Sequence, residues 1–79
     1  MPKASMYFNL PDLHSKQDSA KIKRDLDAVP GIFSVSVNTE RGRVAVDYDT
    51  TGTGPEQIRG RIQKCGFEIG DEWTELHIM

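Results

Sequence analysis

Residues 32–48 read IFSVSVNTERGRVAVDY and contain two short runs rich in apolar residues, the first of which alternates them with serine. The runs cover residues 32–37 and 44–48, and a period of two is typical of β-strands that bury one face. The polar segment between them, residues 38–42, ends in Gly42, which can adopt the positive φ of a tight turn. This stretch therefore predicts a β-hairpin.

The segment on the N-terminal side of the hairpin predicts a strand followed by a helix. Residues 6–10 (MYFNL) alternate in the same way, and proline at position 11 cannot continue a strand ladder. A helix is expected from near Ser15 to the helix-breaking pair Pro30-Gly31. Its apolar residues share one face at helical spacing: Ile22, Leu26 and Val29.

The segment on the C-terminal side predicts a second helix and a last strand. Pro55 follows a loop over residues 50–54 and suits the first position of a helix, which Gly66 ends. The core-facing positions of this helix are Ile58, Ile62 and Cys65. A short strand is expected to begin at Phe67. The order predicts an α+β, ferredoxin-like βαββαβ sandwich, with two helices on one face of a four-stranded antiparallel sheet.

The length of 79 residues suits one domain over 1–79, with a core over about 5–70 and a tail over 71–79. The sequence leaves open whether the tail extends the last strand, folds onto the sheet or pairs with another chain. No run approaches the roughly 20 apolar residues of a membrane span, and no signal-peptide pattern opens the chain, so no membrane partner is expected. The single cysteine excludes an intrachain disulfide, and these features together are typical of a cytoplasmic protein.

Several stretches of the chain resemble the heavy-metal-associated domain, the family of metallochaperone-like proteins. They are residues 29–32, like that family's helix-to-strand corner, residues 34–38 and 41–49, like its central hairpin, and residues 55–58 with 65–67, like its second helix and exit. The resemblance covers roughly residues 6–69. It implies the ferredoxin-like fold, a non-catalytic role in metal homeostasis and contact with protein partners.

The loop before the first helix departs from the family pattern. The family carries a Met-x-Cys-x-x-Cys loop there, and the corresponding positions in this chain are Leu13, Ser15 and Asp18. Copper(I) is a soft ion that prefers thiolates, so the resemblance implies a degenerate metal-binding motif without tight copper(I) binding. We expect Leu13 to enter the core in place of the methionine. Ser15 and Asp18 fit a capping box, in which Ser15 accepts from the N–H of Asp18 and Asp18 from the N–H of Ser15.

The same loop leaves open a weak site for a hard metal ion. The candidate residues are His14, Ser15 and Asp18, with Asp12 nearby, because an imidazole and carboxylates suit zinc or nickel. We expect no other cofactor. Cys65 fits a small buried side chain, although a sulfur close to this loop could also assist a metal ion or cross-link a dimer.

Charge is unevenly distributed along the chain, whose formal net charge is −2. The helix segments 15–29 and 55–65 contain seven basic and four acidic residues, which leaves −5 for the remainder. We therefore expect the helix face to dock an acidic protein partner, with a homodimer as the alternative. The candidate interaction residues are Lys16, Lys21, Arg24, Arg61 and Lys64.

Two other functions occur on this fold, and the sequence favours neither. RNA-recognition modules stack bases on exposed aromatic residues, but Arg43 and Ala45 stand where those rings would be, which leaves Tyr7 alone. The net charge also disfavours a nucleic-acid partner. Acylphosphatase-like chemistry needs an anion-cradling loop with an arginine, and residues 11–18 contain neither glycine nor arginine. With no nucleophile–base pair elsewhere, we do not expect an enzyme.

Overall fold

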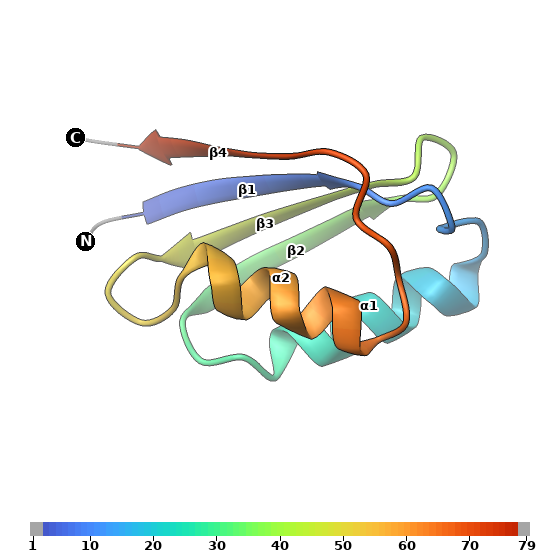
Figure 1. Ribbon diagram of the computed structural model, residues 1–79. Helices are drawn as coiled ribbons and strands as arrows, with labels where there is room; N and C mark the ends of the chain where they lie inside the picture. The colour runs from blue at the N-terminus through green and yellow to red at the C-terminus, as the bar shows by residue number, and fades with distance from the viewer. Residues whose placement is uncertain (1–2, 78–79) are drawn as a thin grey trace.

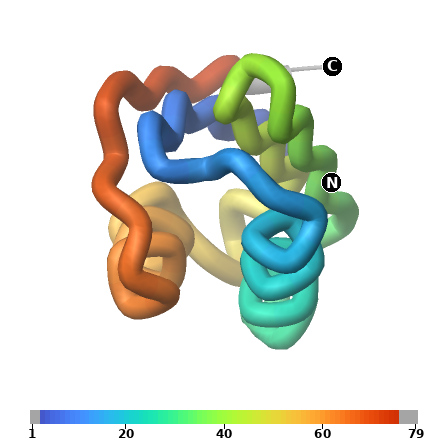
Figure 2. The backbone as a smooth tube through the Cα atoms, turned by 90° about the vertical axis from the view of Figure 1, so that its right-hand side faces the viewer, coloured from blue at the N-terminus to red at the C-terminus, as the bar shows by residue number. Residues whose placement is uncertain are grey.

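The computed structural model describes residues 3–77, which form four strands and two helices (Figure 1). In chain order these are β1 (Lys3–Asn9), α1 (Lys16–Asp27), β2 (Ile32–Asn38), β3 (Arg43–Asp49), α2 (Pro55–Lys64) and β4 (Glu72–His77). The strands pair antiparallel in the order β2-β3-β1-β4. Both helices cover one face of the sheet and leave the other open (Figure 2). The expected βαββαβ sandwich is confirmed, and within residues 3–77 no helix has the length and apolarity of a membrane span.

The hydrophobic core fills the space between the sheet and the helices. β3 buries every second side chain. β1 buries Ala4, Met6 and Phe8 and also Ser5, whereas α1 and α2 each bury one apolar stripe. The largest buried side chains are Met6, Phe8, Leu10, Leu13, Ile22, Leu26, Val44, Val46, Tyr48, Ile58 and Ile62. Burying a side chain of this size is worth about 1.5–3 kcal/mol, and this apolar burial is what fixes the helices on the sheet.

The β2–β3 hairpin forms as the alternation predicted, with Val37 opposite Val44 and Asn38 opposite Arg43. Gly42 adopts a φ of 63°, and a β-carbon on it would lie 2.8 Å from the carbonyl oxygen of Leu10. A residue with a side chain would therefore push the hairpin tip away from the segment that follows β1.

The fourth strand begins later than expected. The sequence predicted a strand from Phe67, but β4 covers Glu72–His77, and pairing to β1 starts where the N–H of Gly70 donates to the carbonyl of Asn9 at 2.8 Å. Phe67 is buried in the core beyond the end of α2. The residues after it therefore connect the helix layer to the sheet before the chain can pair with β1. Of the three possibilities for the tail, extension of the sheet is correct for residues 72–77; residues 78–79 lie outside the described residues.

Candidate functional site

The loop between β1 and α1 packs beside the tip of the β2–β3 hairpin. The N–H of Leu10 donates to the carbonyl of Gly42 at 2.7 Å. The two segments line a hollow of about 180 Å³, whose polar walls include His14, Glu40 and Arg41. Leu13 is buried in the core and anchors the loop, as predicted. This end of the molecule is therefore where a metal loop of the expected family would lie.

Ser15 is the N-cap of α1, and its hydroxyl accepts a hydrogen bond from the N–H of Asp18 at 3.1 Å. This half of the predicted capping box is confirmed. The other half is wrong, because the Asp18 carboxylate accepts from the N–H of His14, at 3.4 Å, and not from that of Ser15. The Asp side chain is one methylene shorter than the Glu of the usual motif. Its carboxylate accepts from the N–H of His14, the residue before the N-cap. Both polar side chains thus hold the start of the helix.

The residues of this loop do not fit a soft metal ion. Residues 10–18 contain no sulfur atom. Across residues 3–77, no three His, Cys, Asp or Glu side chains are grouped so that they could hold a metal ion. His14 and Ser15 are exposed and Asp18 is half-buried, so this part of the chain offers no enclosed set of ligands. The hard-metal site at His14, Ser15 and Asp18 stays a prediction.

Cys65 follows the last turn of α2 and is buried, as expected for a small core side chain. Its Sγ lies 2.7 Å from Oδ2 of Asp25, in the second half of α1. Burial and then the Asp25 carboxylate raise the pKa of the Cys65 thiol to about 11. A thiol with that pKa stays protonated at neutral pH, so it does not supply the thiolate that copper(I) prefers.

The predicted interaction residues all lie in the helix layer, but they differ in their surroundings. Lys16 and Arg24 are exposed on α1. The ammonium of Lys21 donates to the carbonyl of Cys65 at 3.1 Å, which ties α1 to the end of α2. Arg61 is half-buried and Lys64 is exposed, and these two line a groove.

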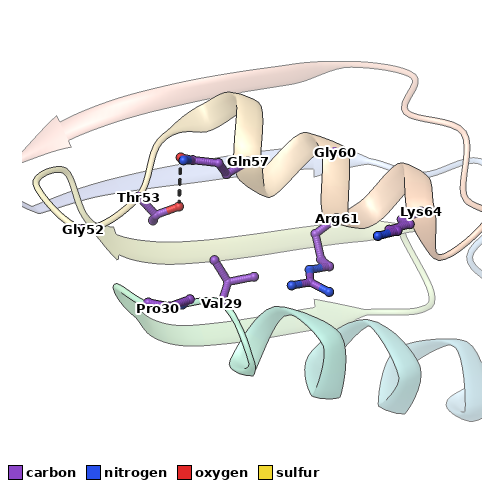
Figure 3. Close-up of a pocket in the computed structure, with 8 residues that line it drawn as sticks. All are labelled: Val29, Pro30, Gly52, Thr53, Gln57, Gly60, Arg61 and Lys64. Carbon is purple, nitrogen blue, oxygen red and sulfur yellow. Dashed lines mark hydrogen bonds between the residues drawn. The ribbon is translucent and has the colours of Figure 1, made fainter.

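The groove has a volume of about 440 Å³ and lies between α2 and the corner that follows α1 (Figure 3). Val29 and Pro30 supply an apolar wall, and Arg61 reaches across from α2. Gly60 leaves open space in the wall of the groove, because a β-carbon added to it would meet no atom within 4 Å. The sequence did not predict this groove, since its walls come from segments about thirty residues apart in the chain.

The open face of the sheet carries an aromatic pair that the sequence also did not predict. Tyr7 of β1 and Trp73 of β4 stack with their ring centroids 5.4 Å apart and an interplanar angle of 22°. The guanidinium carbon of Arg43 lies 5.4 Å from the centroid of the Trp73 ring. Trp73 remains 39% exposed. The expectation that Tyr7 stands alone on this face is therefore wrong, because β4 places Trp73 directly opposite it.

The sequence and the fold were each compared with those of known proteins, and both comparisons find metal-handling domains. A sequence model of the heavy-metal-associated domain matches residues 8–68. A copper-exporting P-type ATPase of Bacillus subtilis is 32% identical over 60 residues, which are 76% of this chain and 8% of that protein. The copper chaperone CopZ of Staphylococcus aureus is 24% identical over 62 residues, covering 78% of this chain and 91% of the chaperone. The solved structure of a CopZ metallochaperone matches with a TM-score of 0.80 at 23% identity, covering 84% of this chain and 98% of that one.

Proposed function

The chain belongs to the heavy-metal-associated domain family, and from this premise we propose that it acts in metal handling through protein contact, without holding copper(I) tightly. The observation that carries the proposal is the groove on the helix layer, which combines an apolar wall with a cationic rim. The chemistry of the β1–α1 loop supports the second half of the proposal. Where the family has thiolates, Ser15 and Asp18 are engaged in capping α1. In this reading the domain is not an enzyme.

The groove suits a partner segment in which acidic residues flank one apolar side chain. Val29 and Pro30 offer the apolar side chain a surface, and the missing side chain of Gly60 leaves it room. Arg61 and Lys64 would then face the flanking carboxylates. Complementary charge of this kind mainly raises the association rate and selects the partner. We place this contact in the cytoplasm, with an acidic metal-handling protein as the partner.

The test is an NMR titration of the ¹⁵N-labelled protein with a synthetic nine-residue peptide of glutamates around a central leucine. Amide shifts should concentrate at Val29 and at the residues of 52–64 that have an N–H, and they should weaken as salt is added. Arg61→Glu should reduce the affinity. Lys23→Glu, the same charge change at an exposed site on α1 that does not line the groove, is the matched control. Shifts spread evenly over the surface, or equal losses in both variants, would contradict the proposal.

Weak hard-metal binding by Asp12, His14 and Asp18 is the second candidate. The residue types favour it, because an imidazole and two carboxylates lie within residues 12–18 and the Asp18 carboxylate accepts from the backbone N–H of His14. A titration with zinc or nickel separates the two functions. Shifts confined to residues 12–18 would support the metal site. An unchanged spectrum would exclude it and leave protein contact as the only candidate function. Light scattering during the same series tests the homodimer.

A further inference from the structure

β4 is an edge strand whose outer side is open. It pairs with β1 in an unbroken register from Glu72 opposite Phe8 to His77 opposite Lys3, and in the described chain no strand lies on its other side. Natural edge strands are usually protected by lysine, proline or a bulge. β2, at the opposite edge, has an irregular register around the exposed Phe33. β4 contains neither lysine nor proline, so its outer edge can accept another strand.

The charge around β4 selects what can bind there. The segment 66–77 contains four acidic residues and no lysine or arginine. Glu72 is engaged by Arg59 of α2, with Nε–Oε1 and Nη2–Oε2 distances of 2.7 and 2.9 Å, which braces β4 against the helix layer. Asp71 and Glu75 are exposed. Two copies paired through β4 would bring these acids together, so the edge favours a basic partner over a second copy of itself.

The aromatic pair on the open face already has a cation of its own. The guanidinium carbon of Arg43 lies 5.4 Å from the centroid of the Trp73 ring, so the carboxylate of Glu75, and not this ring, is the group that favours an incoming basic side chain. Glu75 is two residues further along β4 and therefore shares the open face with Trp73. A strand added beside β4 would place every second side chain next to this ring and this carboxylate. Basic residues at alternate positions would meet the Glu75 carboxylate.

From these observations we propose that β4 is a docking edge for an extended basic segment of a partner protein, which adds to the sheet as a fifth strand. Backbone hydrogen bonds along β4 would provide most of the affinity, while Glu75 selects the basic side chains and Trp73 reports the added strand. The edge belongs to the sheet and the groove to the helix layer. This interaction is thus independent of the proposed helix-face contact, and either can exist without the other.

The probe is a ten-residue peptide that alternates lysine and threonine, and the control peptide carries glutamate in place of lysine. Trp73 is the only tryptophan, so its fluorescence reports binding at the edge directly. The lysine peptide should change the Trp73 emission and slow amide hydrogen exchange in β4. Glu75→Lys should weaken binding about fivefold, the range of one or two exposed charge pairs. Asp27→Lys, an equal charge change at an exposed site on α1, should have little effect.

Four results would overturn the proposal. The first is equal binding of the glutamate peptide, and the second is protection of amides in the helix layer instead of β4. The third is equal weakening by Glu75→Lys and Asp27→Lys, which would show that only net charge matters. The fourth is a Trp73 response to a uridine oligonucleotide, or to the protein's own concentration, with none to the lysine peptide. Those responses would assign the face to RNA or to a dimer.

Discussion

Replacing Gly60 by alanine should stabilise the protein. Glycine within a helix costs about 1 kcal/mol relative to alanine, because its backbone is freer in the unfolded chain. Gly60 lies inside α2, its φ is not positive, and an added β-carbon would meet nothing within 4 Å. No steric penalty therefore offsets the gain, and the free energy of unfolding should rise by about 1 kcal/mol. In a domain of this size, that corresponds to an increase of roughly 4–8 °C in Tm.

Gly66→Ala is the matched control for this prediction. A β-carbon at Gly66 would also meet no atom within 4 Å, but its φ is +93°, a conformation that alanine rarely adopts. The same methyl group should therefore destabilise the protein here, by about 1–2 kcal/mol. Urea unfolding followed by circular dichroism measures both variants. A Gly60→Ala protein that is less stable than wild type, or two variants with the same sign, would refute the reasoning from backbone conformation.

The Gly60→Ala variant also tests function, because its new methyl group points into the space that the groove offers to a partner. Affinity for the acidic peptide should fall while stability rises. This combination distinguishes a docking role for Gly60 from general damage to the fold.

Four further predictions concern the first loop and the buried thiol. Ser15→Ala should lower the free energy of unfolding by about 1 kcal/mol in urea, since it removes the acceptor for the Asp18 N–H; a change below about 0.3 kcal/mol would mean that the hydroxyl is not the cap. The native chain should take no copper(I) from a chromophoric chelator under reductant. Ser15→Cys combined with Asp18→Cys should gain copper-dependent thermal stability, because a spacing of three residues at the start of α1 places both sulfur atoms on one side of the helix. A folded double variant without that gain would show that the family alignment through the loop is incorrect. At pH 8, Cys65 of the folded protein should react with a disulfide reagent about 100-fold more slowly than Cys65 of the urea-unfolded chain, because a pKa of about 11 leaves little thiolate. The reaction rate of the folded protein should increase as the pH rises toward 11. Equal rates in the two states would exclude the raised pKa.

The central elements of the fold could be predicted because their signals are local. β1, β2 and β3 each alternate within seven residues, and the S-x-x-D pattern at Ser15 predicts its cap from four adjacent positions. The start of β4 could not be predicted in this way. Phe67 and Ile69 alternate like strand residues, but Phe67 is buried because it closes the core beyond α2. That contact depends on where the helix ends in space.

The features that the sequence did not predict share one property, which is that they join residues distant in the chain. The contact between Tyr7 and Trp73 exists only after β4 has paired with β1. The groove likewise requires α2 to pack beside the corner at Val29 and Pro30. Composition and periodicity describe neighbours along one element, so they identify the faces of the helices and strands but not the surfaces formed between them.

The pairing of Lys3 with His77 has a consequence for how this fold can be combined with other proteins. The two residues are partners on adjacent strands, so only about 5 Å separates the points where the chain enters and leaves the sheet. Both points lie at the end of the molecule opposite the Ser15 loop (Figure 1). A host protein could carry the fold as an insertion in a single surface loop without opening that loop. Several copies on one polypeptide would all present the β1–α1 loop away from their tethers, which makes the fold suited to modular duplication.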